Sequence, residues 1–148
     1  MKGKCMSIRS IHPIAGLLAM GMIALFMLST LLAEASGSSA AILMTKRGIV
    51  MALPVLILAL AATGGSGYRR ARKPLAGATR RKLGRMRIIA ANGLMLLVPC
   101  AVFLMVRAGT GRLDGVFFAV QVVELVAGAV NLALLAANFR EGLKMRRR

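Results

Sequence analysis

The chain has 148 residues, 58% of them apolar, and a mean hydropathy of +0.76, which excludes an ordinary water-soluble domain built around one small core. Lys and Arg number 21 against four Asp and Glu, so the net charge is +17. The basic residues fall in clusters between long apolar runs, and the five Phe lie inside those runs. We therefore expect anionic lipid head groups, rather than nucleic acid, to meet the basic clusters.

Four long apolar stretches follow one another along the chain. A helix of about 20 apolar residues crosses the hydrocarbon core of a bilayer. The predicted fold is therefore all-α: a single membrane domain, residues 1–148, in which four transmembrane helices form two antiparallel hairpins. The predicted helices span about 13–33, 47–67, 87–107 and 115–139.

The segments that connect these helices differ in charge. The N-terminal segment, a basic loop at about 68–86 counted together with the adjoining Arg87, and a basic tail at 140–148 hold 17 Lys and Arg, whereas the other two loops hold four. Lys46 and Arg47 belong to the first of those two loops. Because Lys and Arg in short loops stay on the cytoplasmic side, we predict a multi-pass protein of the bacterial inner membrane with both termini cytoplasmic.

The first apolar stretch has a second interpretation, a cleavable secretory signal. The tripeptide Ala33-Glu34-Ala35 resembles a cleavage site, but the stretch exceeds the roughly 7–15 residues usual for a signal. Removal of residues 1–35 would leave three helices and an extracytoplasmic N-terminus. A retained first helix is the favoured interpretation.

The sequence contains no recognisable set of residues for catalysis or for a bound metal or cofactor. Cys5 and Cys100 lack the CxxC spacing, and His12 has no second histidine to complete a bis-histidine haem site. The four acids are scattered, so neither a paired-carboxylate site nor a catalytic triad can be assembled. We expect a protein that is not an enzyme and holds no cofactor or metal.

Polar residues recur on one face of the fourth predicted helix. Gln121, Glu124, Asn131 and Asn138 are spaced so that a helix brings them to one side, and Asn92 of the third helix lies at a depth that allows an amide contact. Such a stripe faces protein or water, because an unpartnered polar group in hydrocarbon is costly. These five residues form the predicted intramembrane polar face.

Glu124 is the one acid placed inside a predicted span, near the bilayer midplane. One hypothesis makes it a structural lock that hydrogen-bonds Ser29, Thr30 or the carbonyl of Val50, which Pro54 would free. The other makes it a proton- or cation-binding group, the default functional reading of an intramembrane carboxylate. The lock is the favoured hypothesis.

Two further patterns concern helix packing. Pro99 predicts a kink that releases the carbonyl of Met95 in the third helix. Ala129, Ala133 and Ala137 form a small-residue ladder on the fourth helix, which suits close contact with another helix. A second copy of the chain or another membrane protein is therefore a candidate partner.

The basic loop is expected to contact anionic lipid head groups, at about 1 kcal/mol for each basic residue near the surface. The residues predicted to make these contacts are Arg69, Arg70, Arg72, Lys73, Arg80, Arg81, Lys82, Arg85 and Arg87.

The stretches ATGGSG (62–67), RMRIIAANG (85–93) and QVVELVAGAVNLALLAANFREGL (121–143) are similar to small four-helix bacterial inner-membrane proteins of unassigned function. The resemblance covers most of the chain and implies the helix count and the inner membrane. It implies no activity, cofactor or catalytic residue.

The sequence thus favours a non-enzymatic inner-membrane protein that acts as an accessory or partner-binding bundle. The alternative is a proton-coupled small-molecule transporter, since small four-helix multidrug carriers similarly use a buried glutamate, although on their first helix. A holin-like pore is a third class, suggested by the small size and the basic tail.

Overall fold

The computed structural model describes the backbone of residues 8–70 and 77–146, and the side chains of residues 13–65 and 84–142. The described residues contain helices and turns but no strand, as the all-α prediction requires. The elements are α1 (Ile8–Ala35), α2 (Ser39–Arg70), α3 (Gly77–Asn92), the π-helix η1 (Gly93–Leu97), α4 (Val98–Gly109) and α5 (Gly115–Arg146).

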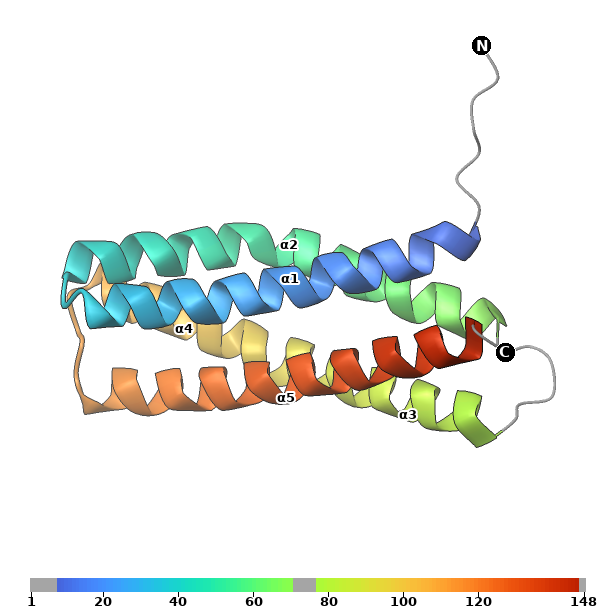
Figure 1. Ribbon diagram of the computed structural model, residues 1–148. Helices are drawn as coiled ribbons and strands as arrows, with labels where there is room; N and C mark the ends of the chain where they lie inside the picture. The colour runs from blue at the N-terminus through green and yellow to red at the C-terminus, as the bar shows by residue number, and fades with distance from the viewer. Residues whose placement is uncertain (1–7, 71–76, 147–148) are drawn as a thin grey trace, which may run out of the picture.

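Four segments of the described residues are long and apolar enough to cross a membrane: Pro13–Ala35, Ser39–Gly65, Gly84–Gly109 and Gly115–Gly142. The third of these runs through α3, η1 and α4. The helices lie lengthwise beside one another, and Figure 1 shows the α1–α2 turn and the α4–α5 connection at one end of the bundle. We call this the hairpin end. At the opposite end, the basic end, α1 begins and α5 finishes.

The outer surface of the bundle is apolar along its length. Large hydrophobic side chains project outward from every span, among them Met51 at 82% exposed, Leu58 at 70% and Met95 at 81%. A water-soluble monomer rarely exposes so continuous an apolar surface. The hydrocarbon core of a bilayer, in contrast, accommodates such a surface readily. The fold is therefore compatible with a multi-pass membrane protein.

Two glycines in left-handed conformations end helices at the hairpin end. Gly37 (φ 65°) follows α1, where its N–H bonds the carbonyl of Glu34, and Gly111 (φ 70°) follows α4, where its N–H bonds the carbonyl of Ala108. A positive φ strains residues with a Cβ, so glycine ends these helices at little cost. Two tight reversals result, and both bring antiparallel helices side by side.

Asp114 caps the first turn of α5. Its Oδ1 accepts a hydrogen bond of 3.0 Å from the Phe117 N–H, and its Oδ2 pairs with Arg107 of α4. The hydrogen bond from Phe117 holds the pKa of this carboxyl below its ordinary value of 3.8, and the charge of Arg107 acts in the same direction. The cap therefore ties the start of α5 to the end of α4.

The capping interaction is expected to weaken in acid. The pKa of the Asp114 carboxyl is lower in the folded state than in the unfolded state. The stabilisation from the cap is therefore fully present above the unfolded pKa of about 3.9, and it is lost as pH falls through the lower folded value. NMR titration of the Asp114 carboxyl carbon should give a midpoint below 3.8. Asp114→Asn, which keeps the acceptor oxygen, is the control that should show no such titration. A midpoint at or above 3.8 would contradict the assignment.

The helices extend beyond the predicted bounds, chiefly because those bounds were drawn where charges begin. Helix α2 starts at Ser39, α3 covers residues 77–92 and α5 continues to Arg146, so much of the predicted basic loop and tail is helical. Charged residues form helices readily where a helix leaves the bilayer. Placing Lys46 in the first outer loop was wrong: it lies within α2 and is 1% exposed.

A π-helical turn lies in the third span just before Pro99, the residue at which the sequence predicts a kink. The Val98 N–H bonds the carbonyl of Gly93, five residues back, in the turn that precedes Pro99. Proline has no N–H to donate and its ring crowds the preceding turn, and a widened turn accommodates both. Asn92 lies at the start of this irregular segment.

Candidate functional site

A buried ion pair joins α2 to α5 inside the bundle. The Lys46 ammonium donates a hydrogen bond to Glu124 Oε2 over 2.7 Å, and the two side chains are 1% and 12% exposed. A charge inside a bilayer protein is costly unless it is paired. Each side chain therefore supplies the partner that makes the burial of the other tolerable.

Two neutral side chains complete this group. Gln121 lies one turn from Glu124 on α5 and donates from Nε2 to the same Oε2 over 3.0 Å. Thr30 of α1 accepts a 3.4 Å hydrogen bond from the Lys46 ammonium through Oγ1. We call Thr30, Lys46, Gln121 and Glu124 the polar cluster. It links three spans through side chains alone.

The distribution of bonds within the polar cluster is uneven. Oε2 of Glu124 accepts both hydrogen bonds, while Oε1 accepts none from the residues described. Gln121 Oε1 and Glu34 Oε1 are buried without a hydrogen-bond partner among the described residues. Glu34 lies one turn from Thr30 on α1 and interacts electrostatically with Lys46 and Glu124. The Lys46 ammonium thus contacts two oxygens directly, Thr30 Oγ1 and Glu124 Oε2.

The structure revises the predicted surroundings of Glu124. Of the expected partners, Thr30 belongs to the cluster but bonds Lys46, and Ser29 instead donates to the carbonyl of Phe26. Measured along the helices, Lys46 lies about 10 Å from Ser39 and Glu124 about 14 Å from Gly115, so the cluster lies on the hairpin-end side of the middle of these spans. The depth of Glu124 relative to the bilayer midplane stays a prediction.

A second polar contact joins the third span to α5. Asn92 Nδ2 donates to Asn131 Oδ1 over 2.8 Å and to the carbonyl of Ala127 over 2.9 Å, and Asn131 Nδ2 donates to the carbonyl of Ile89 over 3.4 Å. The predicted amide contact thus involves Asn131, which is fully buried. Such intramembrane bonds average about 0.6 kcal/mol each, so this contact aligns helices more than it stabilises them.

The remaining predicted positions on α5 divide between its inner and outer faces. Asn138 is buried, but its side-chain atoms have no hydrogen-bond partner among the described residues. On the other side of the helix, Ala129 and Ala133 are exposed and Ala137 is half-buried. No helix of the described chain therefore covers the first two alanines of the predicted ladder.

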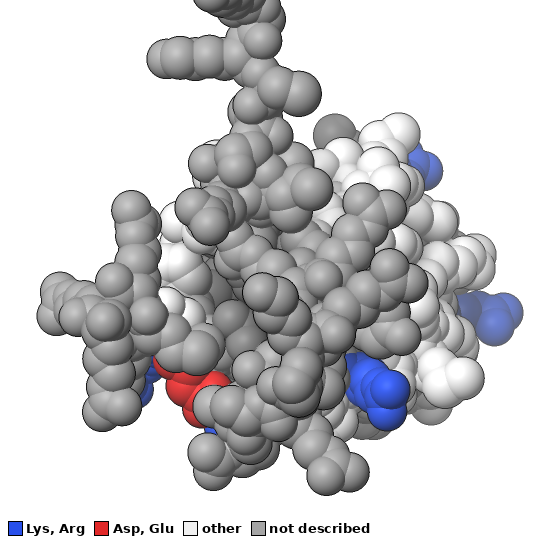
Figure 2. All heavy atoms as spheres, turned by 90° about the vertical axis from the view of Figure 1, so that its right-hand side faces the viewer, with Lys and Arg blue, Asp and Glu red and all other residues white. Residues whose placement is uncertain are grey.

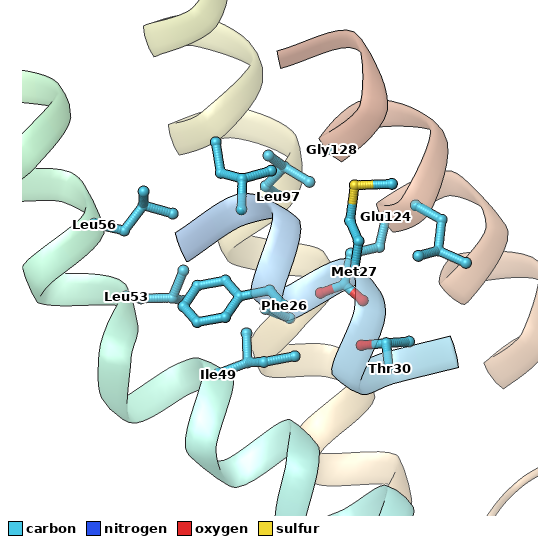
Figure 3. Close-up of a pocket in the computed structure, with 12 residues that line it drawn as sticks. Phe26, Met27, Thr30, Ile49, Leu53, Leu56, Leu97, Glu124 and Gly128 are labelled. Carbon is cyan, nitrogen blue, oxygen red and sulfur yellow. The ribbon is translucent and has the colours of Figure 1, made fainter. Parts of the chain in front are cut away.

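A small pocket of about 50 Å³ lies between α1, α2, the η1–α4 segment and α5. Figure 3 shows Phe26 pointing from α1 towards Leu53, and Glu124 reaching from α5 towards Thr30. The wall is otherwise formed by apolar side chains and Gly128. The residues that line it are Ile23, Phe26, Met27, Thr30, Ile49, Leu53, Leu56, Leu97, Ala101, Glu124, Leu125 and Gly128.

The basic end carries charged side chains at its edge. Figure 2 views this end and shows basic and acidic groups around its margin. Arg85 of α3 pairs with Glu141 of α5 over 2.8 Å, and Arg87 is exposed. The side chains of the other residues predicted to contact lipid head groups lie outside the described set, and head-group contact stays a prediction for all nine.

Within the described residues, no three His, Cys, Asp or Glu side chains converge as metal ligands would. Comparison of the chain with protein-family models, with curated proteins and with solved structures found no match. The fold and the polar cluster therefore define the protein only as a helical bundle with four spans that could cross a membrane.

Proposed function

We propose that this protein is a non-enzymatic accessory or partner-binding bundle of the bacterial inner membrane, with both termini cytoplasmic. The observation that supports this most directly is the internal pairing of Glu124 with Lys46 over 2.7 Å. The carboxylate that could have bound a substrate cation is used to connect α5 to α2. Its role is to hold the helices in one arrangement.

The charge distribution supports the proposed orientation. With Lys46 inside the bundle, the hairpin end keeps Arg47, Arg107 and Arg112, and one of these, Arg107, pairs with Asp114. The basic end and the segments next to it keep the 17 Lys and Arg counted above. The charge contrast that supports a cytoplasmic basic end is therefore greater than the sequence count suggested.

The exposed alanines of α5 support a role in partner binding. Small residues on a membrane helix allow another helix to approach closely, which strengthens van der Waals contact where no hydrophobic driving force operates. Ala129 and Ala133 are open to such an approach. The proposed partner is a transmembrane helix, supplied by another membrane protein or by a second copy of this chain.

The second candidate, a proton-coupled small-molecule transporter, draws support from the pocket because Glu124 is part of its wall. A carrier of this kind must release its carboxylate to bind substrate and proton in turn. Here that step would have to break the bonds from Lys46 and Gln121 to the same oxygen. The accessory role requires no such rearrangement.

A transport assay separates the two candidates. We expect purified protein in proteoliposomes under a pH gradient to take up a lipophilic cation such as ethidium no faster than protein-free liposomes. The Glu124→Gln variant should behave identically. Gradient-driven uptake that Glu124→Gln abolishes would replace the proposal with the carrier, and uptake that persists in the variant would indicate a pore.

A further inference from the structure

The pocket beside the polar cluster has the features of a binding site for one chemical class of ligand. Its wall combines apolar side chains from all four spans with two polar residues, Thr30 and Glu124. Phe26, Met27, Leu97 and Leu125 of that wall are only half-buried, so the pocket is not sealed from its surroundings. In a membrane those surroundings are lipid, and an occupant would arrive from the bilayer.

The unused oxygen of Glu124 defines the head group of such a ligand. Oε1 accepts no hydrogen bond from the described residues, while Oε2 is occupied by Lys46 and Gln121. A carboxylate oxygen only accepts, so the ligand must donate. Thr30 Oγ1 already accepts from Lys46, which leaves its own O–H available to donate to a ligand oxygen. A hydroxyl group both donates and accepts, and so matches both partners.

The size and polarity of the pocket restrict the rest of the ligand. A volume of about 50 Å³ admits only a few heavy atoms, since one water molecule needs about 10 to 15 Å³ of such a cavity. Lys46 already balances the charge of Glu124, and an ionic head group would have to lose its water for a site with few polar partners. A neutral head followed by a flexible chain meets both limits.

From these features we infer that the pocket binds the hydroxyl end of a neutral long-chain alcohol or similar lipid, with the hydroxyl between Glu124 Oε1 and Thr30 and the first carbons against Phe26 and Leu53. The chain extends outward between the helices into the bilayer. This site is independent of the accessory role proposed above, because it requires neither a partner protein nor movement of a solute across the membrane.

Photolabelling tests this site directly. The full chain in phospholipid nanodiscs is exposed to a decanol analogue that carries a diazirine near its hydroxyl, and labelled peptides are mapped by mass spectrometry. We expect saturable labelling at residues that line the pocket, such as Met27 and Leu97. Excess 1-decanol should reduce it at least fivefold, whereas decane or decyltrimethylammonium should change it less than twofold.

Two alanine substitutions provide a matched pair. Ala101 is buried in the pocket wall, whereas Ala119 is exposed on α5 and is not part of the wall. Ala101→Leu should reduce saturable labelling at least fivefold, and Ala119→Leu should leave it within twofold. If Ala101→Leu fails to fold, Gly128→Ala serves instead, because its added Cβ meets Met27 Sδ at an ordinary contact distance of 3.5 Å and narrows the pocket.

The head-group assignment has its own test in the double variant Lys46→Met/Glu124→Met, which removes the polar acceptor. Decanol should then compete no better than decane. Equal competition by decanol and decane in the parent protein would overturn the proposal, as would stronger competition by the ammonium compound. Labelling that does not saturate, or that is equally strong at the outward-facing Met51 and Leu58, would also overturn it.

Discussion

Lys46→Met is expected to destabilise the protein by about 3 to 5 kcal/mol, the usual cost of removing one member of a buried ion pair. The loss arises because Glu124 stays in the bundle without its ammonium partner, rather than from the strength of the bond itself. Reversible unfolding with sodium dodecyl sulfate in mixed micelles, followed by circular dichroism, measures the change. Arg47→Met is the matched control: Arg47 is exposed on the same helix, and its loss should cost less than about 0.5 kcal/mol.

The double variant Lys46→Met/Glu124→Met decides the origin of that loss. Replacing both members of a buried pair by apolar residues is often neutral or stabilising. We expect the free energy of unfolding to return to within about 1 kcal/mol of the parent value. A double variant as unstable as the single one would mean that the ion pair itself supplies the stability. A single variant with unchanged stability would mean that the pair is not formed.

Phe117→Ala is expected to lower the free energy of unfolding by about 2 kcal/mol. Phe117 is fully buried in a cluster with Leu104 and Ala108 of α4, and its removal leaves a cavity. This expected loss of stability is smaller than the roughly 3 to 5 kcal/mol typical of Phe→Ala in soluble proteins. Lipid is as apolar as the protein interior, so the loss is mainly one of packing. The same micelle titration measures it.

Phe118→Ala is the control for this prediction. Phe118 is next in sequence, touches Phe117 edge to face with ring centroids 5.5 Å apart, and is 46% exposed. Its truncation should cost less than about 0.5 kcal/mol. Phe117 also lies one turn from Gln121 on the side of the hairpin end, so its loss should speed hydrogen exchange around Gln121. Equal effects of the two truncations would contradict the burial difference.

The number and order of the spans could be predicted from the sequence because both depend on hydropathy. About 20 consecutive apolar residues have few alternatives to a membrane helix. The inward position of Gln121 and Asn131 could also be predicted, from their spacing along the helix, because lipid offers no hydrogen-bond partner to a side-chain amide. Both side chains are buried in the bundle.

The partner of Glu124 could not be predicted in the same way. A charged residue usually marks the end of a span, so the sequence pattern predicts Lys46 in a loop. A lysine is stable inside a span when a carboxylate lies opposite, and that condition depends on how distant helices pack. A search for opposite charges at similar depths in different apolar stretches would have identified the pair.

The separation of the paired residues along the chain has a consequence for biogenesis. Lys46 and Glu124 are 78 residues apart, and at about 5 to 20 residues per second the ribosome needs roughly 4 to 16 s to make the intervening segment. During that interval the first hairpin exists with a lysine whose carboxylate partner has not been synthesised. The Lys46–Glu124 pair therefore forms only after α5 has been made, and until then Glu34 is the acid of the first hairpin that acts on this lysine.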